Sequence, residues 1–154
     1  MTGKHGLQLI EHYEGCYLQA YQCPAGVWTI GIGTTRYPFG EQVKEGDTLE
    51  SRQQAVALMQ GDLKRFELAV AKLVDVPLDQ HEFDALVSLV YNIGVGAYKD
   101  STLLKKINAG AGVDEIVLEW MRWNKAGGKV SQGLINRRKS EVHLYRHGEL
   151  KFFN

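Results

Sequence analysis

The stretch EGCYLQAYQCPAGVWTIGIGTT, residues 14–35, decides how the start of the chain folds. Two segments rich in β-branched and aromatic residues flank a Pro-Ala-Gly turn at 24–26, which predicts a β-hairpin. Ahead of it, Leu7 and Ile10 have the spacing of a short amphipathic helix. Gly15 is where that helix should end, so the hairpin is expected to follow the helix directly.

Helical periodicity dominates the chain beyond residue 50. Ser51 followed by Gln54 has the form of a capping box, and apolar residues then recur every three or four positions up to Leu73. The strongly apolar segment 78–93 predicts a helix that is buried on most sides and closed by Gly94.

Three more helices are expected toward the C-terminus. The first covers most of 101–110, the second is capped by Asp114, and the third covers 134–147 with a basic exposed side. The pair Gly127-Gly128 is expected to break the chain between the last two.

These elements predict an α+β fold, in which a small N-terminal β-hairpin lobe and a larger all-helical lobe are joined by a long helix. We expect one domain over residues 1–154. Within it, the β-lobe and cleft wall should cover about 12–48, the connecting helix 51–75 and the helical lobe 78–154. The N-terminal helix is expected to pack on the helical lobe.

The net charge is zero, but the charges are unevenly distributed along the chain. Residues 122–154 hold eight basic and two acidic residues, a net charge of +6, so residues 1–121 carry −6. A basic C-terminal segment fits attraction to an anionic polymer, and it fits equally a solvated helix beside acidic neighbours.

Several functional classes are disfavoured by composition. No apolar run approaches the roughly 18 residues of a membrane span, and the N-terminus lacks the apolar core of a signal peptide. Cys16 and Cys23 are too few for a disulfide scaffold and are expected to be thiols in a reducing compartment. The five histidines are scattered, so no zinc spacing is present.

The hairpin stretch carries the residues that are best suited to catalysis. Eight residues separate Glu14 from Cys23, and five separate Cys23 from Thr29. Cleavage of an acetal needs a carboxylic acid to protonate the leaving oxygen and a second group to position water. Glu14 fits the first need, while Thr29 and Cys23 fit the second. Taken singly, each residue type is more often solvated, strand-forming or simply packed than catalytic.

A resemblance gives the spacing its meaning. The segment LIEHYEGCYLQAYQCPAGVWTIGIGTT is similar to the N-terminal signature of the phage-type lysozymes, glycoside hydrolase family 24, in which Glu, Asp or Cys, and Thr are separated by eight and five residues. NIGVGAYKDSTLLKKIN at 92–108 and AGGKVSQGLINRRKSE at 126–141 resemble two further segments of that family. The resemblance therefore covers nearly the whole chain and implies a lysozyme-like fold.

Two positions depart from the better-known members of the family. Cys23 stands where many carry Asp, and a neutral thiol lacks the fixed negative charge of a carboxylate, so we expect it to position or polarise water. Thr34 stands where many members carry His. That His looks structural in the family, so its replacement puts a stabilising side-chain pair in question but not the catalytic reaction.

The resemblance implies cleavage of the β-1,4 bond between N-acetylmuramic acid and N-acetylglucosamine in peptidoglycan. Glu14 would be the proton donor, with Cys23 and Thr29 holding the attacking water, which implies inversion; a covalent Cys23 adduct with retention is the alternative. Arg137 matches an Arg that pairs with the catalytic Glu, although it would otherwise read as a solvated or capping residue. Tyr21 is a candidate platform for a sugar face.

The implied cellular setting is host lysis. We expect a monomer that needs no cofactor or metal, binds glycan strands of peptidoglycan and no nucleic acid, and has no membrane segment. It would wait in the host cytoplasm without a signal peptide until a holin releases it to the periplasm and cell wall.

Three other interpretations remain open at this point. The alternatives are a tail-associated lysozyme, an exported wall-degrading effector, and a non-catalytic peptidoglycan-binding domain on the same scaffold. A disulfide between Cys16 and Cys23 would consume the thiol at the catalytic position and act as a redox switch.

Overall fold

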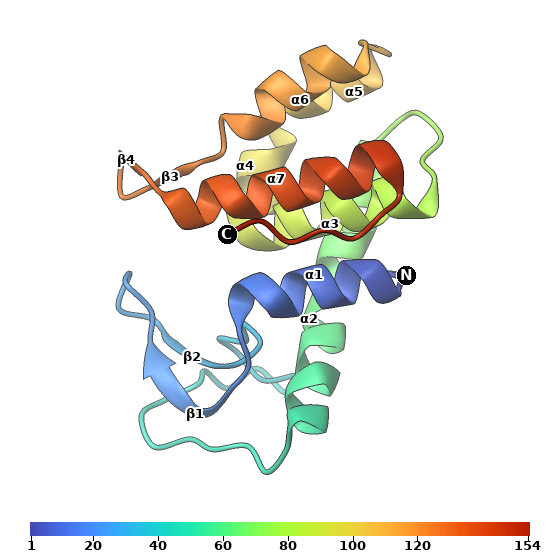
Figure 1. Ribbon diagram of the computed structural model, residues 1–154. Coiled ribbons are helices and arrows are strands. Elements are labelled where there is room, and N and C mark those ends of the chain that lie inside the picture. The colour runs from blue at the N-terminus through green and yellow to red at the C-terminus, as the bar shows by residue number, and fades with distance from the viewer. The chain divides into compact units, whose positions relative to one another are not determined.

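The computed structural model describes residues 1–154 and contains seven helices and two small antiparallel sheets (Figure 1). The chain forms two compact units: unit 1 comprises 1–9 and 66–154, and unit 2 comprises 10–65. The unit boundaries fall inside helix α1 (Lys4–Glu14) and helix α2 (Arg52–Leu73). None of the helices is both long enough and apolar enough to cross a membrane.

Unit 2 is built around the predicted hairpin. Strand β1 (Tyr17–Gln22) pairs antiparallel with strand β2 (Trp28–Gly31), and the register is irregular between Tyr17 and Tyr21. The two strands differ in environment, because β1 is largely exposed whereas β2 is mostly buried. Ile30 and Ile32 are fully buried in this unit, as are Ala55, Met59 and Leu63 of α2, of which none is more than 1% exposed. The predicted helix and hairpin are thus confirmed.

The start of α2 follows the predicted cap with one difference. The Ser51 hydroxyl accepts a hydrogen bond from the Gln54 amide at 3.3 Å. The Gln54 side chain reaches one residue further back than a capping box requires, and accepts from the Glu50 amide at 2.6 Å.

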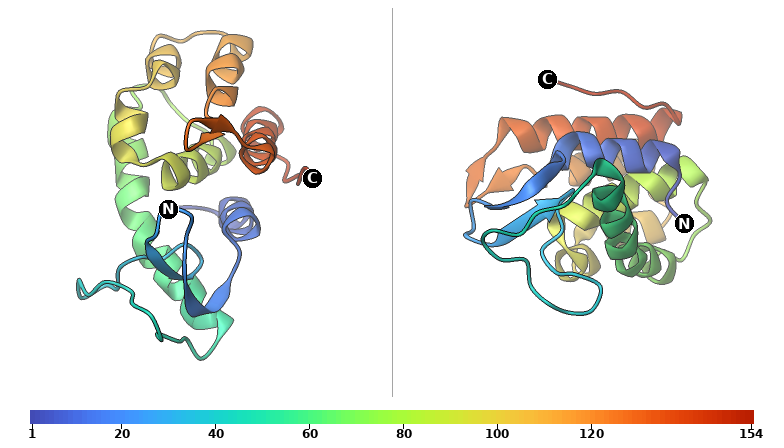
Figure 2. Two further views of the ribbon diagram at one scale, coloured as in Figure 1. Left: turned by 90° about the vertical axis from the view of Figure 1, so that its left-hand side faces the viewer. Right: turned by 90° about the horizontal axis from the view of Figure 1, so that it is seen from below.

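Unit 1 is helical and is organised around α3 (Gln80–Ile93) and α7 (Gln132–His147), which lie along each other (Figure 1). Residues 84–90 of α3 are all buried, as the apolar sequence of this segment predicts. Helices α5 (Thr102–Asn108) and α6 (Val113–Met121) lie side by side, as the left view of Figure 2 shows. The short helix α4 (Val95–Lys99) connects α3 to α5 and was not predicted.

Two details of the C-terminal part differ from the prediction. The N-cap of α6 is Gly112 rather than Asp114, which lies in the first turn, where its charge still complements the helix dipole. Gly127 and Gly128 do not simply interrupt the chain but form the turn between strands β3 (Lys125–Ala126) and β4 (Lys129–Val130). Both glycines have positive φ angles, of 57° and 80°.

The exposed side of α7 carries Lys139 and Arg146, as predicted, but the two central arginines of this helix are buried. Arg137 and Arg138 are 3% and 0% exposed, and both donate to Glu141, which is itself fully buried. The same carboxylate accepts from Ser88 of α3 at 2.6 Å and from the Trp120 indole of α6 at 3.1 Å. One buried carboxylate therefore binds side chains of three helices, which satisfies the requirement that a buried charge be paired and hydrogen-bonded.

Candidate active site

Glu14 is the last residue of α1 and is half-buried. Helix α1 ends because Gly15 adopts a φ of +76°, a conformation that favours glycine, while its amide still donates to the Glu11 carbonyl at 2.8 Å. The ring of Tyr17 covers this glycine so closely that a Cβ there would lie 2.8 Å from a ring carbon. This close turn fixes the position of Glu14 relative to the start of the hairpin.

Cys23 lies at the start of the hairpin turn and is half-buried. Its amide donates to the Val27 carbonyl at 3.0 Å, and its own carbonyl accepts from the Gly26 amide at 2.8 Å. Gly26 has a φ of +81°, as the Pro-Ala-Gly turn requires. Cys16 and Cys23 are both free thiols in the structure.

Thr29 lies in β2 and is only 5% exposed. Its hydroxyl donates to the Val27 carbonyl at 3.1 Å. Because that bond uses the only proton of the hydroxyl, the lone pairs on its oxygen remain to accept a hydrogen bond from another group. The arrangement suits a residue that orients a water molecule by accepting a hydrogen bond from it.

Tyr21 connects these residues. It is the direct partner of Thr29 in the β1–β2 register, and side chains of directly paired residues lie on the same face of a sheet. Burial raises the pKa of the Tyr21 phenol, and the nearby Glu14, Tyr17 and Cys23 raise it further. The acid and the thiol are therefore both within electrostatic reach of one hydroxyl, which stays protonated and able to donate.

The structure thus gathers four of the five predicted site residues in unit 2: Glu14, Tyr21, Cys23 and Thr29. Arg137 belongs to unit 1, where its guanidinium donates to the Ser88 carbonyl at 3.1 Å and to Glu141. Its pairing with Glu14 stays a prediction.

Sequence reasoning missed the contribution of Tyr17. Its ring lies 4.6 Å from that of Tyr21, and it also lies over Gly15. The signal was present, since Tyr17 and Tyr21 are an even number of positions apart on one strand and so tend to share a face.

The departure at position 34 retains a stabilising pair. Thr34 is fully buried, and its hydroxyl donates to Asp62 of α2 at 2.8 Å. Burial raises the pKa of Asp62, while the Thr34 hydrogen bond and the charge of Arg65 oppose that rise. No group of three His, Cys, Asp or Glu side chains in the molecule is arranged to hold a metal ion.

Comparison with known proteins decides the family. The profile described as "Phage lysozyme" matches residues 11–141. The chain belongs to the phage lysozyme family. An endolysin of Acyrthosiphon pisum secondary endosymbiont phage 1 is 42% identical to this phage lysozyme. The match covers 91% of this phage lysozyme and 94% of the endolysin. The endolysin of Bacillus phage B103 is 40% identical over 95% of the chain, which spans only 54% of that longer protein.

Solved structures agree with this assignment. An endolysin from Escherichia coli O157:H7 phage FAHEc1 superposes with a TM-score of 0.89 at 39% identity, covering 98% of this phage lysozyme and 96% of the other chain. The muramidase domain of SpmX from Asticaccaulis excentricus gives a TM-score of 0.83 at 36% identity, covering 94% of this chain and 97% of the other. The predicted lysozyme-like α+β fold is confirmed, and this phage lysozyme is a peptidoglycan hydrolase of the lysozyme type.

Proposed function

We propose that this phage lysozyme is an endolysin that lyses the host by hydrolysing the β-1,4 bond between N-acetylmuramic acid and N-acetylglucosamine. The observation that carries the proposal is the position of Tyr21, opposite Thr29 in the hairpin and within reach of both Glu14 and Cys23. Residues 1–154 would act as a single lysozyme domain.

In the proposed mechanism Glu14 protonates the leaving glycosidic oxygen while water attacks the anomeric carbon from the opposite face. Thr29 accepts a hydrogen bond from that water, since its own hydroxyl donates to the Val27 carbonyl. The proton that the water loses on attack passes to bulk solvent. Cys23 is the second contact of the water, as a polarisable and uncharged group. Such a single displacement inverts the anomeric centre, and the acid and the water-binding group are then roughly 6.5–9.5 Å apart.

Two further residues complete the proposed site. The Tyr21 phenol supports the acid and offers its ring to a sugar face. Arg137 is proposed to pair with Glu14, and its buried bonds to Ser88 and Glu141 would hold the guanidinium in one orientation.

The proposed cellular role includes a holin, which would release a monomeric enzyme from the host cytoplasm to the wall. The names of the relatives, endolysins of several phages, support this role. Expression of the enzyme in a bacterial host with and without a co-expressed holin tests it. Lysis that is independent of the holin would overturn the holin requirement.

Glu14→Gln is the decisive variant for the catalytic proposal. We expect it to lower the rate of murein hydrolysis by about 10²–10⁴-fold, because the amide cannot act as a general acid. Clearing of cells with permeabilised outer membranes, and reducing ends released from purified murein, measure this loss. Equal activity of Glu14→Gln and wild type would remove Glu14 from its role.

The products of the wild-type enzyme test the stereochemistry. We expect early proton NMR spectra to show the α anomer first, as inversion of a β bond requires. An early β anomer would support a covalent intermediate, and 1,6-anhydro sugars would show a lytic transglycosylase instead of a hydrolase. Wild-type protein that binds murein without cleaving it would be a binding module.

A further inference from the structure

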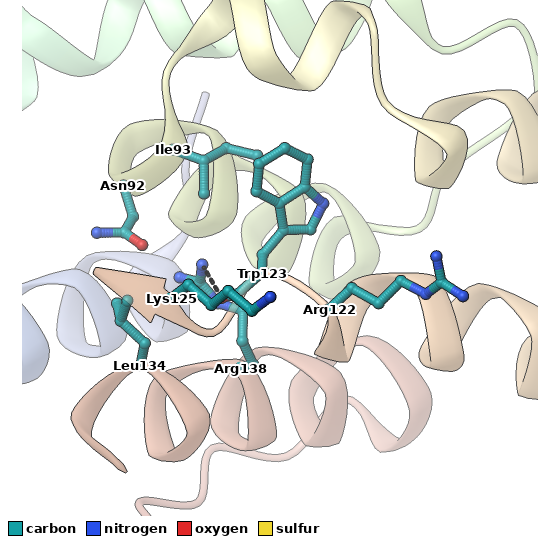
Figure 3. Close-up of a pocket in the computed structure, with 7 residues that line it drawn as sticks. All are labelled: Asn92, Ile93, Arg122, Trp123, Lys125, Leu134 and Arg138. Atoms are coloured by element: carbon teal, nitrogen blue, oxygen red, sulfur yellow. Dashed lines mark hydrogen bonds between the residues drawn. The ribbon is translucent and has the colours of Figure 1, made fainter. Parts of the chain in front are cut away.

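Arg52, the first residue of α2, binds Glu11 of α1 through two hydrogen bonds. Its Nε donates to one oxygen of the Glu11 carboxylate at 2.6 Å, and Nη2 donates to the other oxygen. This bidentate arrangement fixes both the distance and the orientation of the two side chains. The contact is tighter than that of Arg122, whose guanidinium points away from the other labelled side chains in Figure 3 and meets Glu119 only at 3.8 Å.

Glu11 belongs to the last turn of α1, which carries the candidate acid. Its carbonyl accepts the Gly15 amide at 2.8 Å, and it precedes Glu14 by three positions, a spacing that makes the two side chains neighbours on the helix surface. The hydrogen bonds and charge of Glu11 raise the pKa of the Arg52 guanidinium, and Cys16 also acts to raise it. Because Cys16 directly follows Gly15, the guanidinium lies near the junction between α1 and β1.

The first turn of α2 also packs against the hairpin. A Cβ added at Gly31 of β2 would lie 3.3 Å from the Ala55 Cβ and 3.4 Å from the Leu49 side chain, so the helix and the strand are in close contact. The Leu49 amide, just ahead of α2, donates to the Leu18 carbonyl of β1 at 2.7 Å. Both strands of the hairpin are therefore attached to the segment that carries Arg52.

The Arg52–Glu11 pair thus connects the two parts of the proposed site, all within unit 2. The candidate acid is on α1, whereas Cys23 and Thr29 are on the hairpin. A single displacement needs the acid and the attacking water at a fixed separation, and a misplacement of about 1 Å costs up to about a hundredfold in rate. Exposed ion pairs contribute little to stability, so the main effect of this pair should be on the geometry of the site.

We propose that Arg52 is a positioning residue, which holds the end of α1 at the distance from the hairpin that catalysis needs. The inference rests on the proposed function, because it takes Glu14 as the acid and the hairpin as the element that binds the water. Arg52 acts through the Glu11 carboxylate and not by contact with the substrate. The position of Glu11 in turn sets that of the last turn of α1.

The first test separates kcat from KM. Arg52→Gln keeps a polar side chain but removes the charge and the bidentate contact. On soluble murein fragments we expect kcat to fall about tenfold, with KM within about twofold of the wild-type value. The midpoint of thermal unfolding should change by less than about 2 °C, because the pair is exposed. Arg52→Lys should recover only part of kcat, since an ammonium group lacks the planar fork of Arg.

Lys106→Gln is the matched control. It removes the cation of another exposed ion pair, in which Lys106 of α5 contacts Glu115 of α6 at 3.2 Å in unit 1. We expect its kcat to equal that of the wild type. The loss in Arg52→Gln would then come from the particular contact with α1 and not from the removal of a surface charge.

Exchange of the two charges tests the pair directly. Glu11→Arg and Arg52→Glu should each lower kcat at least as much as Arg52→Gln, because each places two like charges in contact. The double variant Glu11→Arg/Arg52→Glu restores opposite charges, and its kcat should return to within about threefold of wild type. Such recovery is the coupling that two residues in contact show.

A second background separates this proposal from the catalytic one. In Glu14→Gln protein the acid is missing, so Arg52→Gln should lower the residual rate by less than about twofold. Hydrogen exchange at the Gly15 amide, which donates to the Glu11 carbonyl, follows the last turn of α1 without catalysis and should become faster in Arg52→Gln in either background. Full activity of Glu14→Gln would overturn the acid assignment, whereas unchanged kcat in Arg52→Gln beside an inactive Glu14→Gln would overturn the positioning role alone.

Two further results would also contradict the positioning role. An equal loss of kcat in Arg52→Gln and Lys106→Gln would indicate a general effect of surface charge. An undiminished effect of Arg52→Gln in the Glu14→Gln background would indicate a contribution to activity that does not pass through the acid.

Discussion

At the scale of single residues, the thiol of Cys23 replaces the Asp that many phage-type lysozymes carry at this position. An uncharged thiol can share in positioning water, but it cannot supply a fixed negative charge. The Thr29 hydroxyl, which donates its hydrogen bond to the Val27 carbonyl, is then the stronger acceptor of a hydrogen bond from the water. This division of roles can be tested through the reactivity of the thiol.

We predict that alkylation of Cys23 inactivates the enzyme. In a Cys16→Ser background, iodoacetamide should lower activity more than about tenfold, because the added group occupies the water site. Cys16→Ser/Cys23→Asp should keep its activity and resist the reagent. Activity is followed by turbidity and the modification by mass spectrometry. Full activity of the alkylated Cys16→Ser protein would exclude Cys23 from the water site.

Asp62 should make stability depend on pH. Its pKa is raised by burial, so the folded state holds the proton more tightly than the unfolded chain does. Stability from this group is therefore fully present below the ordinary carboxyl pKa of about 4 and is lost as the pH rises through the folded value. Thr34 and Arg65 reduce this effect but do not reverse it.

Asp62→Asn should remove this dependence, because Asn keeps an acceptor for the Thr34 hydroxyl without the charge. We predict that the substitution raises the free energy of unfolding by less than about 1 kcal/mol at pH 7, since the carboxyl is only partly withdrawn from solvent. At pH 3 the free energy of unfolding should hardly change. Urea denaturation at the two pH values measures the difference. A variant that is less stable than wild type at pH 7 would show that the charge of Asp62 is favourable.

At the scale of elements, the junction between α1 and β1 links the candidate acid to the hairpin. Gly15 and Gly26 both adopt positive φ angles, but a Cβ at Gly15 would meet the Tyr17 ring, whereas Gly26 has no neighbour within 4 Å. The two glycines thus form a matched pair, in which one position has only backbone strain and the other has strain and a clash.

We predict that Gly15→Ala and Gly26→Ala each cost about 1–2 kcal/mol of stability from the left-handed backbone. Only Gly15→Ala should also lower kcat strongly, because Tyr17 must move and disturb the neighbouring Tyr21 and Glu14. Thermal unfolding and murein hydrolysis measure the two effects. A similar loss of kcat in both variants would show that the α1–β1 junction has no special part in the site.

The long elements could be predicted because their apolar spacing is local information. The helix before Gly15, the hairpin and the long helix after Ser51 each carry their own caps or turns in the sequence. Short elements lack such signals. The five-residue helix α4 and the two-residue strands β3 and β4 exist because the chain around them is held by tertiary contacts.

The site was predictable only in part, because some of its contacts depend on tertiary structure and not on local sequence. The spacing of Glu14, Cys23 and Thr29 is visible in the sequence, but the bond from Thr29 to the Val27 carbonyl depends on the geometry of the hairpin. The burial of Arg137 and Arg138 was missed because Arg is normally exposed, and only the fold brings Glu141 and Ser88 around them.

At the scale of the whole molecule, the first residues of the chain are part of the C-terminal unit. Asp84 of α3 is 2% exposed and accepts from the Gly3 amide at 2.9 Å and from the Gln80 side chain at 2.7 Å. The Thr2 amide and hydroxyl both donate to Glu67. These bonds hold the start of α1 on unit 1, where Gly6 leaves no space for a side chain between Thr2 and Asp84.

We predict that Asp84→Ala costs about 1–3 kcal/mol, because it leaves buried donors without an acceptor. Hydrogen exchange should become faster in residues 4–9 and at the start of α3, and change less in β1 and β2. Asp100→Ala, at an exposed position, is the control and should cost less than about 0.5 kcal/mol. Equal acceleration of exchange in both units would show that they open together.

The carboxylate of Glu141 also sets the order in which the protein can mature during synthesis. Ser88 and Trp120 leave the ribosome well before the residue that accepts their hydrogen bonds, and the arginines that complete the group come only just ahead of it. The nascent helical unit should stay open and susceptible to proteases until residue 141 has been translated. A premature stop codon anywhere upstream of residue 141 should therefore yield a fragment that is degraded, and not a shortened lysin with residual activity.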